Sequence, residues 1–226
     1  MKIEDLELQK GIKINSGNDA LIIVDMQNDF IPGGALPVKE GDLIIDDINK
    51  LAKKFKDNGA FVVLTQDWHP ENHKSFASSH PGKNPGDQYL SEGIGPVLWP
   101  DHCIQNTEGA EFHKVLNVHL ADKIIQKGMN PEVDSYSGFL ENDKKSETGL
   151  ADYLRSVNIK RIFVCGLALD YCGYFTAIDG VDFGFEVYFL VDLTKGIDLP
   201  PGNISVSLEN MTNKGIKFVL FIGLNN

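Results

Sequence analysis

Short apolar runs alternate with amphipathic segments along most of the chain. The runs occur at residues 20–26, 60–66, 122–128, 160–167, 185–192 and 216–220, and each has the length of a strand. Apolar side chains recur at helical spacing at residues 41–58, and helices are also expected at 147–157 and 172–184, with a polar helix near 203–214. Strands that are apolar throughout and alternate with helices are typical of a parallel sheet covered on both faces. The pattern therefore predicts a doubly wound, mainly parallel α/β fold with helices on both faces.

Two segments fall outside this alternation. Residues 1–18 form a polar lead, and residues 68–110 carry much of the Gly, Pro, Asn and His content. A long insertion of this kind inside a compact domain is usually functional. We expect one domain over residues 1–226, with an N-terminal extension at 1–18 and a loop-rich, metal-binding insertion at 68–110.

The charge composition makes some classes of binding partner unexpected. The 226 residues carry a formal net charge of −11, with the acids scattered along the chain. Nucleic acids and anionic membranes are bound by clustered Lys and Arg, so both are unexpected partners. No run reaches the ~18 apolar residues of a membrane span. Three cysteines do not suggest a disulfide framework. We expect a cytoplasmic protein that acts on a small molecule.

Reactive side chains stand at the ends of four predicted strands. Asp25, Asp67 and Lys127 end the first three, and Cys172 follows the fourth at the start of the next helix. Ligands of open α/β sheets bind outside the carboxyl ends of the strands, which lie at one edge. These four side chains are therefore predicted to converge on one crevice.

Cys172 is the best candidate for a nucleophile. A helix N-terminus favours thiolate, and the backbone N–H of the cysteine can contribute to an oxyanion hole. Asp25, partly buried at a strand end, is a candidate general base for that thiol. Cys165 lies within a strand and is interpreted as a core residue, whereas Cys103, beside His102, is ambiguous.

The same region offers metal ligands. Asp67 and His69 are two residues apart and share one side of an extended chain, and His73 and His102 follow. A carboxylate with imidazoles suits Zn²⁺, Fe²⁺ or Mn²⁺ and leaves positions open for water or substrate. The remaining histidines are interpreted as surface or hydrogen-bonding residues: His80, His113 and His119.

Five segments of the chain carry a resemblance to a known family. They are ALIIVDMQNDFIPGGAL, TQDWHPENHKSF, WPDHCIQNTEGAEFH, KGMNPEVDSYSGF and GLALDYC. In this order they resemble the nicotinamidases of the isochorismatase-like hydrolase superfamily, over about residues 20–220. The resemblance implies the isochorismatase-like hydrolase fold and hydrolysis of nicotinamide, or of pyrazinamide-like analogues, to the acid and ammonia. It also implies a step in NAD salvage and a homo-oligomer.

The resemblance assigns a role to each matching residue. It implies a catalytic triad of Asp25, Lys127 and Cys172. It implies a divalent metal, with zinc preferred, on Asp67, His69 and His102, and water rather than His73 completing the coordination. The oxyanion hole would be formed by the N–H groups of Ala168, after a cis peptide bond, and of Cys172. Phe30, Trp99 and Tyr136 would line the pocket for the substrate ring.

These assignments give a mechanistic hypothesis. Asp25 takes the proton of Cys172, the thiolate attacks the carboxamide carbon, and Asp25 protonates the departing ammonia. Lys127 stabilises the charge on Asp25, and water then hydrolyses the resulting thioester. Leu169 replaces the threonine usual in this family, for which we expect a slower rate. Gly180 lowers helix propensity by ~1 kcal/mol relative to Ala, and the sequence gives it no role.

Three alternative hypotheses compete with the nicotinamidase mechanism. The first is a related small-molecule amidase or isochorismatase of the same superfamily. Cys172 counts against the isochorismatases, and the Asp67, His69 and His102 cluster counts against the metal-free amidases. The second is a non-enzymatic binding protein on this fold, which has no need for an intact triad. The third is a metallohydrolase in which water attacks directly and Cys172 is structural.

Overall fold

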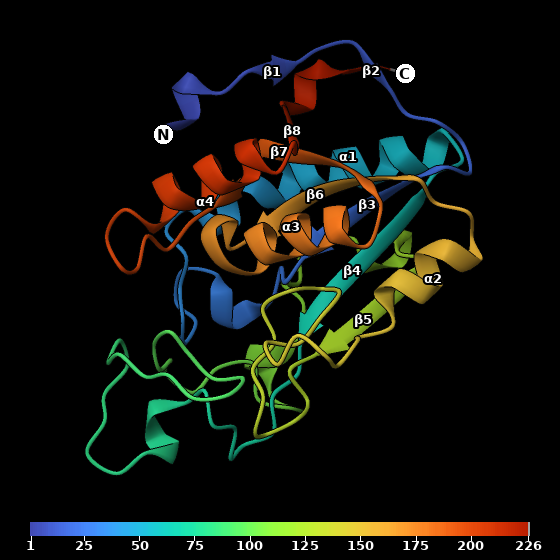
Figure 1. Ribbon diagram of the computed structural model, residues 1–226. Coiled ribbons are helices and arrows are strands. Elements are labelled where there is room, and N and C mark those ends of the chain that lie inside the picture. Colours follow the sequence, from blue (N-terminus) through green and yellow to red (C-terminus); the bar gives the residue numbers. More distant parts are fainter. Residues whose placement is uncertain (226) are drawn as a thin grey trace.

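A seven-stranded sheet forms the centre of the protein, in the order β1-β8-β7-β6-β3-β4-β5, and all its neighbouring strands are parallel (Figure 1). This computed structural model describes residues 1–225. The strands of the sheet are β1 (Leu8–Gln9), β3 (Asp19–Val24), β4 (Phe61–Asp67), β5 (Lys123–Lys127), β6 (Arg161–Leu167), β7 (Glu186–Lys195) and β8 (Lys217–Val219). A separate parallel pair is formed by β2 (Ile12–Lys13) and β9 (Leu224–Asn225).

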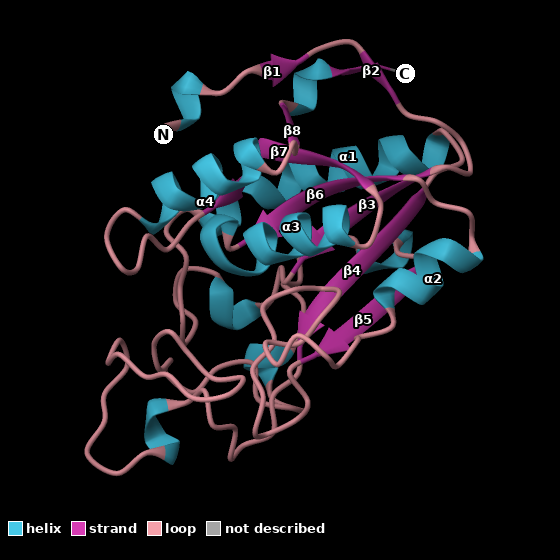
Figure 2. Cartoon of the chain, viewed as in Figure 1, coloured by secondary structure: helices cyan, strands magenta, loops and turns pink. Residues whose placement is uncertain are grey.

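Helices cover both faces of the sheet. They are α1 (Ile45–Asp57), α2 (Leu150–Ser156), α3 (Tyr174–Asp182) and α4 (Asn203–Asn213). The apolar side chains of α1 belong to one buried cluster, and those of α2, α3 and α4 belong to the other. Figure 2 shows α1 on one side of the strands and α3 and α4 on the other. The doubly wound parallel fold predicted from the sequence is confirmed.

The first strand illustrates why the apolar runs are continuous. Ala20 and Ile22 of β3 contribute to the cluster under α3 and α4, whereas Leu21 and Ile23 contribute to the cluster under α1. Successive side chains of a strand point to opposite faces. Because both faces are covered here, neither set needs to be polar.

The strand order contains a switch point beside β3. From β3 the chain continues to β4 and β5 on one side, then returns to β6 on the other side of β3 and goes on to β7 and β8. At such a point the crossovers leave a crevice outside the carboxyl ends of the strands. The loops between β4 and β5 lie beyond these ends, at the bottom of Figure 1.

Most predicted elements occur within a few residues of their expected bounds, with three local differences. The expected helix at 41–58 begins as the 3₁₀ turn Gly41–Ile44, and the expected helix at 172–184 is preceded by the π-helical turn Leu169–Gly173. The polar lead contributes β1, which pairs with β8, and β2, which pairs with β9. Strands of two residues are too short to leave a period in the sequence.

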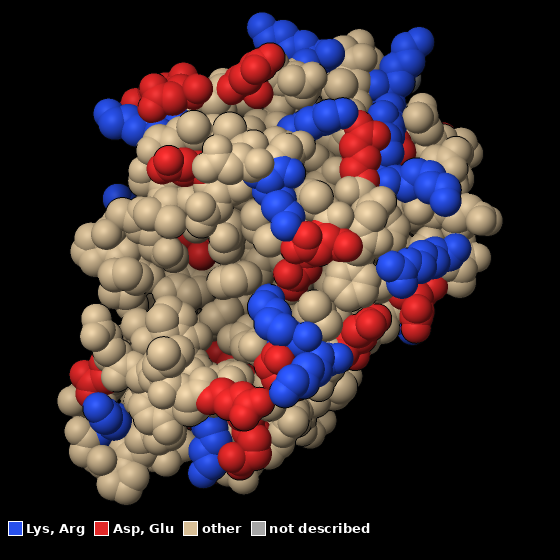
Figure 3. Space-filling view, in the orientation of Figure 1, with Lys and Arg blue, Asp and Glu red and all other residues tan. Residues whose placement is uncertain are grey.

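One face of the molecule carries both signs of charge. On the face shown in Figure 3, basic and acidic side chains are interspersed over a largely uncharged surface.

Among residues 1–225, no helix has the length and apolar character that crossing a bilayer requires.

The structure gives Gly180 of α3 a packing role. A Cβ at this position would lie 2.7 Å from Cδ1 of Ile162 and 3.2 Å from Cγ2 of Val187, in β6 and β7. Contacts below 3 Å force neighbouring atoms to move. Glycine therefore allows α3 to lie directly against the sheet, close to the turn that carries Cys172.

We predict that Gly180→Ala lowers the free energy of unfolding by about 1 kcal/mol, because overpacking of about 1–3 kcal/mol exceeds the ~1 kcal/mol gain in helix propensity. Urea denaturation measures the change. Val206→Ala is the matched control, since Val206 is 54% exposed on α4 and gains propensity without a new contact. Equal stabilisation of both variants would contradict the packing role.

Candidate active site

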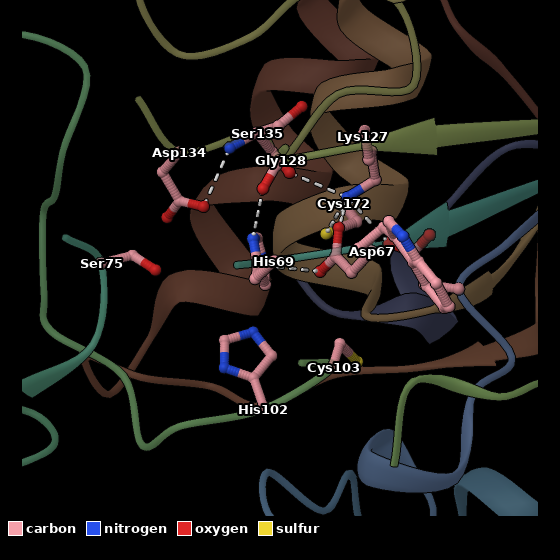
Figure 4. Close-up of polar contacts among 12 residues, drawn as sticks. Asp67, His69, Ser75, His102, Cys103, Lys127, Gly128, Asp134, Ser135 and Cys172 are labelled. Atoms are coloured by element: carbon pink, nitrogen blue, oxygen red, sulfur yellow. Dashed lines mark hydrogen bonds and ion pairs between the residues drawn. The ribbon is translucent and has the colours of Figure 1, made fainter. Parts of the chain in front are cut away.

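The four strand-end residues converge as predicted. Asp67 and Lys127 are the last residues of β4 and β5, Asp25 directly follows β3, and Cys172 lies in the turn after β6. Lys127 is fully buried, and its Nζ donates hydrogen bonds to Asp67 and to the Ser135 carbonyl at 2.8 Å. The same nitrogen lies 3.0 Å from Asp25 Oδ2 and 3.4 Å from Cys172 Sγ. One ammonium thus contacts the other three groups, and Figure 4 shows its contacts with Asp67 and Cys172.

Asp25 has one occupied and one open carboxylate oxygen. Oδ1 accepts a hydrogen bond of 2.5 Å from the Thr65 hydroxyl, whereas Oδ2 has no hydrogen-bond partner apart from the ion pair with Lys127. Burial raises the pKa of Asp25 by more than the charge of Lys127 lowers it. A carboxylate oxygen of Asp25 lies within 4.8 Å of Cys172 Sγ. The carboxyl group can therefore receive a proton from the thiol.

The thiol of Cys172 is held in its protonated form. Burial raises its pKa well above the ordinary value, Lys127 opposes this, and the charges of Asp25 and Asp67 add to the rise. The position of Cys172 at a helix start, which favours thiolate, does not decide the protonation state of its thiol. The geometry places a base next to a neutral thiol.

Asp67, His69 and His102 form a buried group that can hold a metal ion. One ligand atom from each lies within 4.8 Å of the others. Nδ1 of His69 lies 2.8 Å from the Gly128 carbonyl, and Nδ1 of His102 lies 2.8 Å from the Pro100 carbonyl. A carbonyl only accepts, so each Nδ1 carries a proton. Each neutral ring then has a free lone pair on Nε2.

The pKa shifts of Asp67 and His102 suit a cation, whereas that of His69 opposes it. Burial alone would raise the pKa of Asp67, but Lys127 and His69 outweigh it and hold that pKa well below its ordinary value. Burial, together with the charge of His69, lowers the pKa of His102 to about 4. Burial acts to lower the pKa of His69, but Asp67 prevails and raises it. A cation and that proton would compete for the same Nε2.

Gly128 provides space for the His69 ring. It follows β5 with a φ of +67°, and a Cβ there would lie 2.3 Å from the His69 ring. Only glycine combines this left-handed backbone with so close an approach. The glycine after Lys127 is therefore required to fix the orientation of His69.

His73 is buried next to this group, but both of its ring nitrogens are occupied. Nδ1 accepts the backbone N–H of Ser75 at 3.2 Å and lies 2.7 Å from the Ser75 hydroxyl. Nε2 lies 3.2 Å from the Val133 carbonyl. Burial lowers the pKa of His73 to about 3, with a further contribution from His69. In this arrangement the neutral ring presents no free lone pair.

A small pocket opens beside Cys172. Its apolar and aromatic walls are formed by Phe30, Leu36, Trp99, Tyr136, Tyr171 and Ile197. Its other lining residues are Asp67, His102, Asp134, Ala168 and Cys172. Trp99 Nε1 donates to the Tyr136 hydroxyl at 3.0 Å, which in turn donates to the Gly95 carbonyl. The pocket thus brings the three predicted ring-binding residues together with the sulfur and two of the metal-ligand candidates.

The backbone at the edge of the pocket matches the resemblance. The peptide bond between Leu167 and Ala168 is cis. Leu169, which replaces the usual threonine, is buried in the apolar cluster beneath α3 and α4.

Sequence reasoning missed several residues of the site. Thr65 supports Asp25, and Gln27 exchanges hydrogen bonds of 2.8 Å with the backbone N–H and C=O of Asp67. Asp134, in the loop after β5, lines the pocket. All three are buried polar residues, but Gln27 and Asp134 lie among other polar residues in the sequence, so the sequence alone carries no clear signal for them. Cys103, ambiguous in the sequence, is buried outside the pocket lining, and burial raises its pKa.

The chain is similar to known proteins in sequence and in fold. The isochorismatase domain matches residues 19–219. A nicotinamidase of Escherichia coli is 42% identical over 87% of this chain and 92% of its own. A solved nicotinamidase–pyrazinamidase of Acinetobacter baumanii has a TM-score of 0.87 and 45% identity, covering 91% of this chain and 97% of its own.

A further solved structure was determined with a metal. A pyrazinamidase of Pyrococcus horikoshii in complex with zinc has a TM-score of 0.74 and 45% identity, covering 90% of this chain and 99% of its own. The fold, the domain match over residues 19–219 and these identities together show that the chain belongs to the isochorismatase domain family.

Proposed function

We propose that this protein is a nicotinamidase that hydrolyses nicotinamide to nicotinic acid and ammonia. The observation that carries the proposal is the contact between Lys127, Asp25 and Cys172 at a pocket that also exposes Asp67 and His102. A thiol beside a carboxyl base suits attack on an amide. Apolar and aromatic walls suit a small flat ring. The E. coli relative is a nicotinamidase.

Proton transfer in the first step depends on the open oxygen of Asp25. We propose that Asp25 takes the thiol proton of Cys172 as the sulfur attacks the carboxamide carbon. Lys127 holds Asp25 in place and offsets its charge. The N–H groups of Ala168 and Cys172 receive the developing oxyanion. Asp25 then delivers the proton to the departing ammonia, and water hydrolyses the thioester with Asp25 again as base.

We further propose that Asp67, His69 and His102 hold a divalent metal ion, with zinc preferred. Two free Nε2 lone pairs and one carboxylate are a donor set that zinc accepts. The zinc complex of the P. horikoshii relative supports this choice. When bound, the ion would orient the pyridine nitrogen of the substrate. Phe30, Trp99 and Tyr136 would hold the ring, and His73 would support the site without binding the ion.

Two expectations about the protein in the cell belong to this proposal. All three cysteines are unpaired and buried, which fits a reducing compartment such as the cytoplasm. The homo-oligomer implied by the resemblance is a further expectation, and sedimentation analysis of the purified protein tests it.

We predict that purified protein releases ammonia from nicotinamide and that Cys172→Ala lowers kcat about ten-thousand-fold or more, because the nucleophile is lost. The variant is expected to retain its metal. Cys165→Ala is the control, since that thiol is buried in β6 away from the pocket. Near-normal turnover by Cys172→Ala would rule out the covalent mechanism.

We predict that Thr65→Val lowers kcat by about 10–100-fold, because a hydrogen bond to a charged group contributes about 1.5–3 kcal/mol. The effect should fall on kcat rather than KM, since Thr65 contacts Asp25 and does not line the pocket. Thr65→Ser keeps the hydroxyl and should restore most of the rate. Equal activity of the Val and Ser variants would remove Thr65 from the mechanism.

We predict that His102→Ala reduces the metal content measured by elemental analysis and raises KM for nicotinamide. A chelator should have a similar effect on the unmodified protein, and added zinc should reverse it. His119→Ala is the control, because this histidine is exposed outside the site. Full metal content in His102→Ala would refute the ligand assignment.

A further inference from the structure

Two buried side-chain oxygens in residues 1–225 lack a hydrogen-bond partner, and both belong to this site. They are Asp25 Oδ2 and Asp134 Oδ2. The first is compensated by Lys127 Nζ at 3.0 Å, whereas no ion pair is formed by the second in the described part of the chain. An unsatisfied buried acceptor costs about 1–3 kcal/mol, and more when it is charged. Asp134 Oδ2 therefore indicates a missing donor or cation.

The position of Asp134 limits what that partner can be. Asp134 is 3% exposed, and its Oδ1 accepts the Ser135 N–H at 2.8 Å, which fixes the carboxylate. One of its oxygens lies within 4.8 Å of ring nitrogens of His69 and His73. Asp134 also lines the pocket together with Asp67 and His102. Figure 4 shows the second oxygen turned away from Ser135, on the side of Ser75.

The neighbouring groups have no donor left for this oxygen. Lys127 is engaged by Asp25, Asp67 and the Ser135 carbonyl. The three neighbouring imidazoles direct their N–H groups at backbone carbonyls of Gly128, Pro100 and Val133. His69 and His102 turn an acceptor, the Nε2 atom, toward the shared space, whereas both ring nitrogens of His73 are occupied. Such a space is satisfied by a cation or by water molecules that a cation holds.

The charges lead to the same conclusion. Asp25, Asp67 and Asp134 are all buried, and Lys127 is the buried ammonium among them. Three carboxylates against one ammonium leave a formal excess of two negative charges. Buried charge of one sign is costly unless it is compensated. With Asp134 included, a divalent cation would balance this excess of negative charge.

We infer that Asp134 is a positioning residue of the metal centre: its Oδ2 accepts a hydrogen bond from water that accompanies the divalent ion on Asp67, His69 and His102. This inference rests on the proposed metal site and extends it. The metal-binding groups Asp67–His69–His102 and His69–His73–Asp134 share only His69, which fits a carboxylate one layer outside the ligands. His73, with both ring nitrogens occupied, does not take this role.

Metal binding by the unloaded protein tests the inference. Zinc affinity is measured by competition with a coloured chelator for the unmodified protein, Asp134→Asn, Asp67→Asn and Glu141→Gln. Asp134→Asn should weaken zinc binding by about 10–100-fold, the usual effect of removing an outer partner of a metal ligand. Glu141 is a partly buried acid close enough to interact with the charge of Asp134, and it does not line the pocket. Its loss should change affinity by no more than about threefold.

Thermal unfolding separates this role from a purely structural one. An asparagine at 134 keeps the acceptor for Ser135 and places an N–H₂ donor among unsatisfied acceptors. Asp134→Asn should therefore raise the Tm of the metal-free protein by about 2–4 °C per kcal/mol gained, while zinc should raise the Tm less than in the unmodified protein. A structural role would lower the Tm equally with and without zinc, which would overturn the inference.

The outcomes distinguish the inference from the proposal on which it rests. If Asp134→Asn binds zinc as tightly as the unmodified protein while Asp67→Asn does not, the inference is wrong and the metal site stands. If the unmodified protein binds no zinc, the proposed metal site fails and the inference fails with it. Weakened binding in Asp134→Asn but not in Glu141→Gln supports both.

Discussion

The buried ammonium of Lys127 is the interaction on which the site depends. A lysine in a dry interior is stable only when carboxylates and hydrogen-bond acceptors compensate it. Lys127 obtains these from Asp25, Asp67 and the Ser135 carbonyl, which come from three different parts of the chain. Its charge therefore ties the carboxyl ends of β3, β4 and β5 to one point. The same point is 3.4 Å from the sulfur, so the requirement for charge compensation also sets the geometry of the nucleophile and its base.

The strand-end residues could be predicted from the sequence because the strands of the parallel sheet can be recognised from it. Continuous apolar runs specify strands, and right-handed crossovers align their carboxyl ends. Asp25, Asp67 and Lys127 are the residues at which three of these runs end. His102 and Trp99 could not be placed in this way. They lie in a loop-rich segment without a period. His102 was a metal-ligand candidate from its residue type, and only the resemblance linked Trp99 to the pocket. The two-residue strands of the N-terminal lead were missed for the same reason, since their pairing depends on partners at the other end of the chain.

The residues that sequence reasoning missed support other residues of the site and do not themselves take part in the reaction. Thr65 lies in a strand buried on both faces, where a polar position does not disturb an alternation. Gln27 holds the backbone of Asp67, and Asp134 lies in a loop among other polar residues. Each becomes meaningful only when the partners of every buried polar atom are known. The same accounting gives Gly180 and Gly128 their roles, because a close approach of two segments is not visible in composition or spacing.

The protonation state of Cys172 shows which physical effect prevails at this site. A helix start favours thiolate by about 0.3–1 kcal/mol, whereas the mechanism expected from the sequence has Asp25 take the proton of a thiol. Taking an ion out of water costs several kcal/mol, and Asp25 and Asp67 add like charge, so burial raises the pKa of Cys172 despite Lys127. Cys172 is then a neutral thiol next to an open carboxylate oxygen. Such a sulfur becomes nucleophilic only as its proton passes to Asp25, when a substrate supplies the carbon to be attacked. Activation is thereby coupled to substrate binding, and the resting thiol is less exposed to the oxidation that a permanent thiolate would attract.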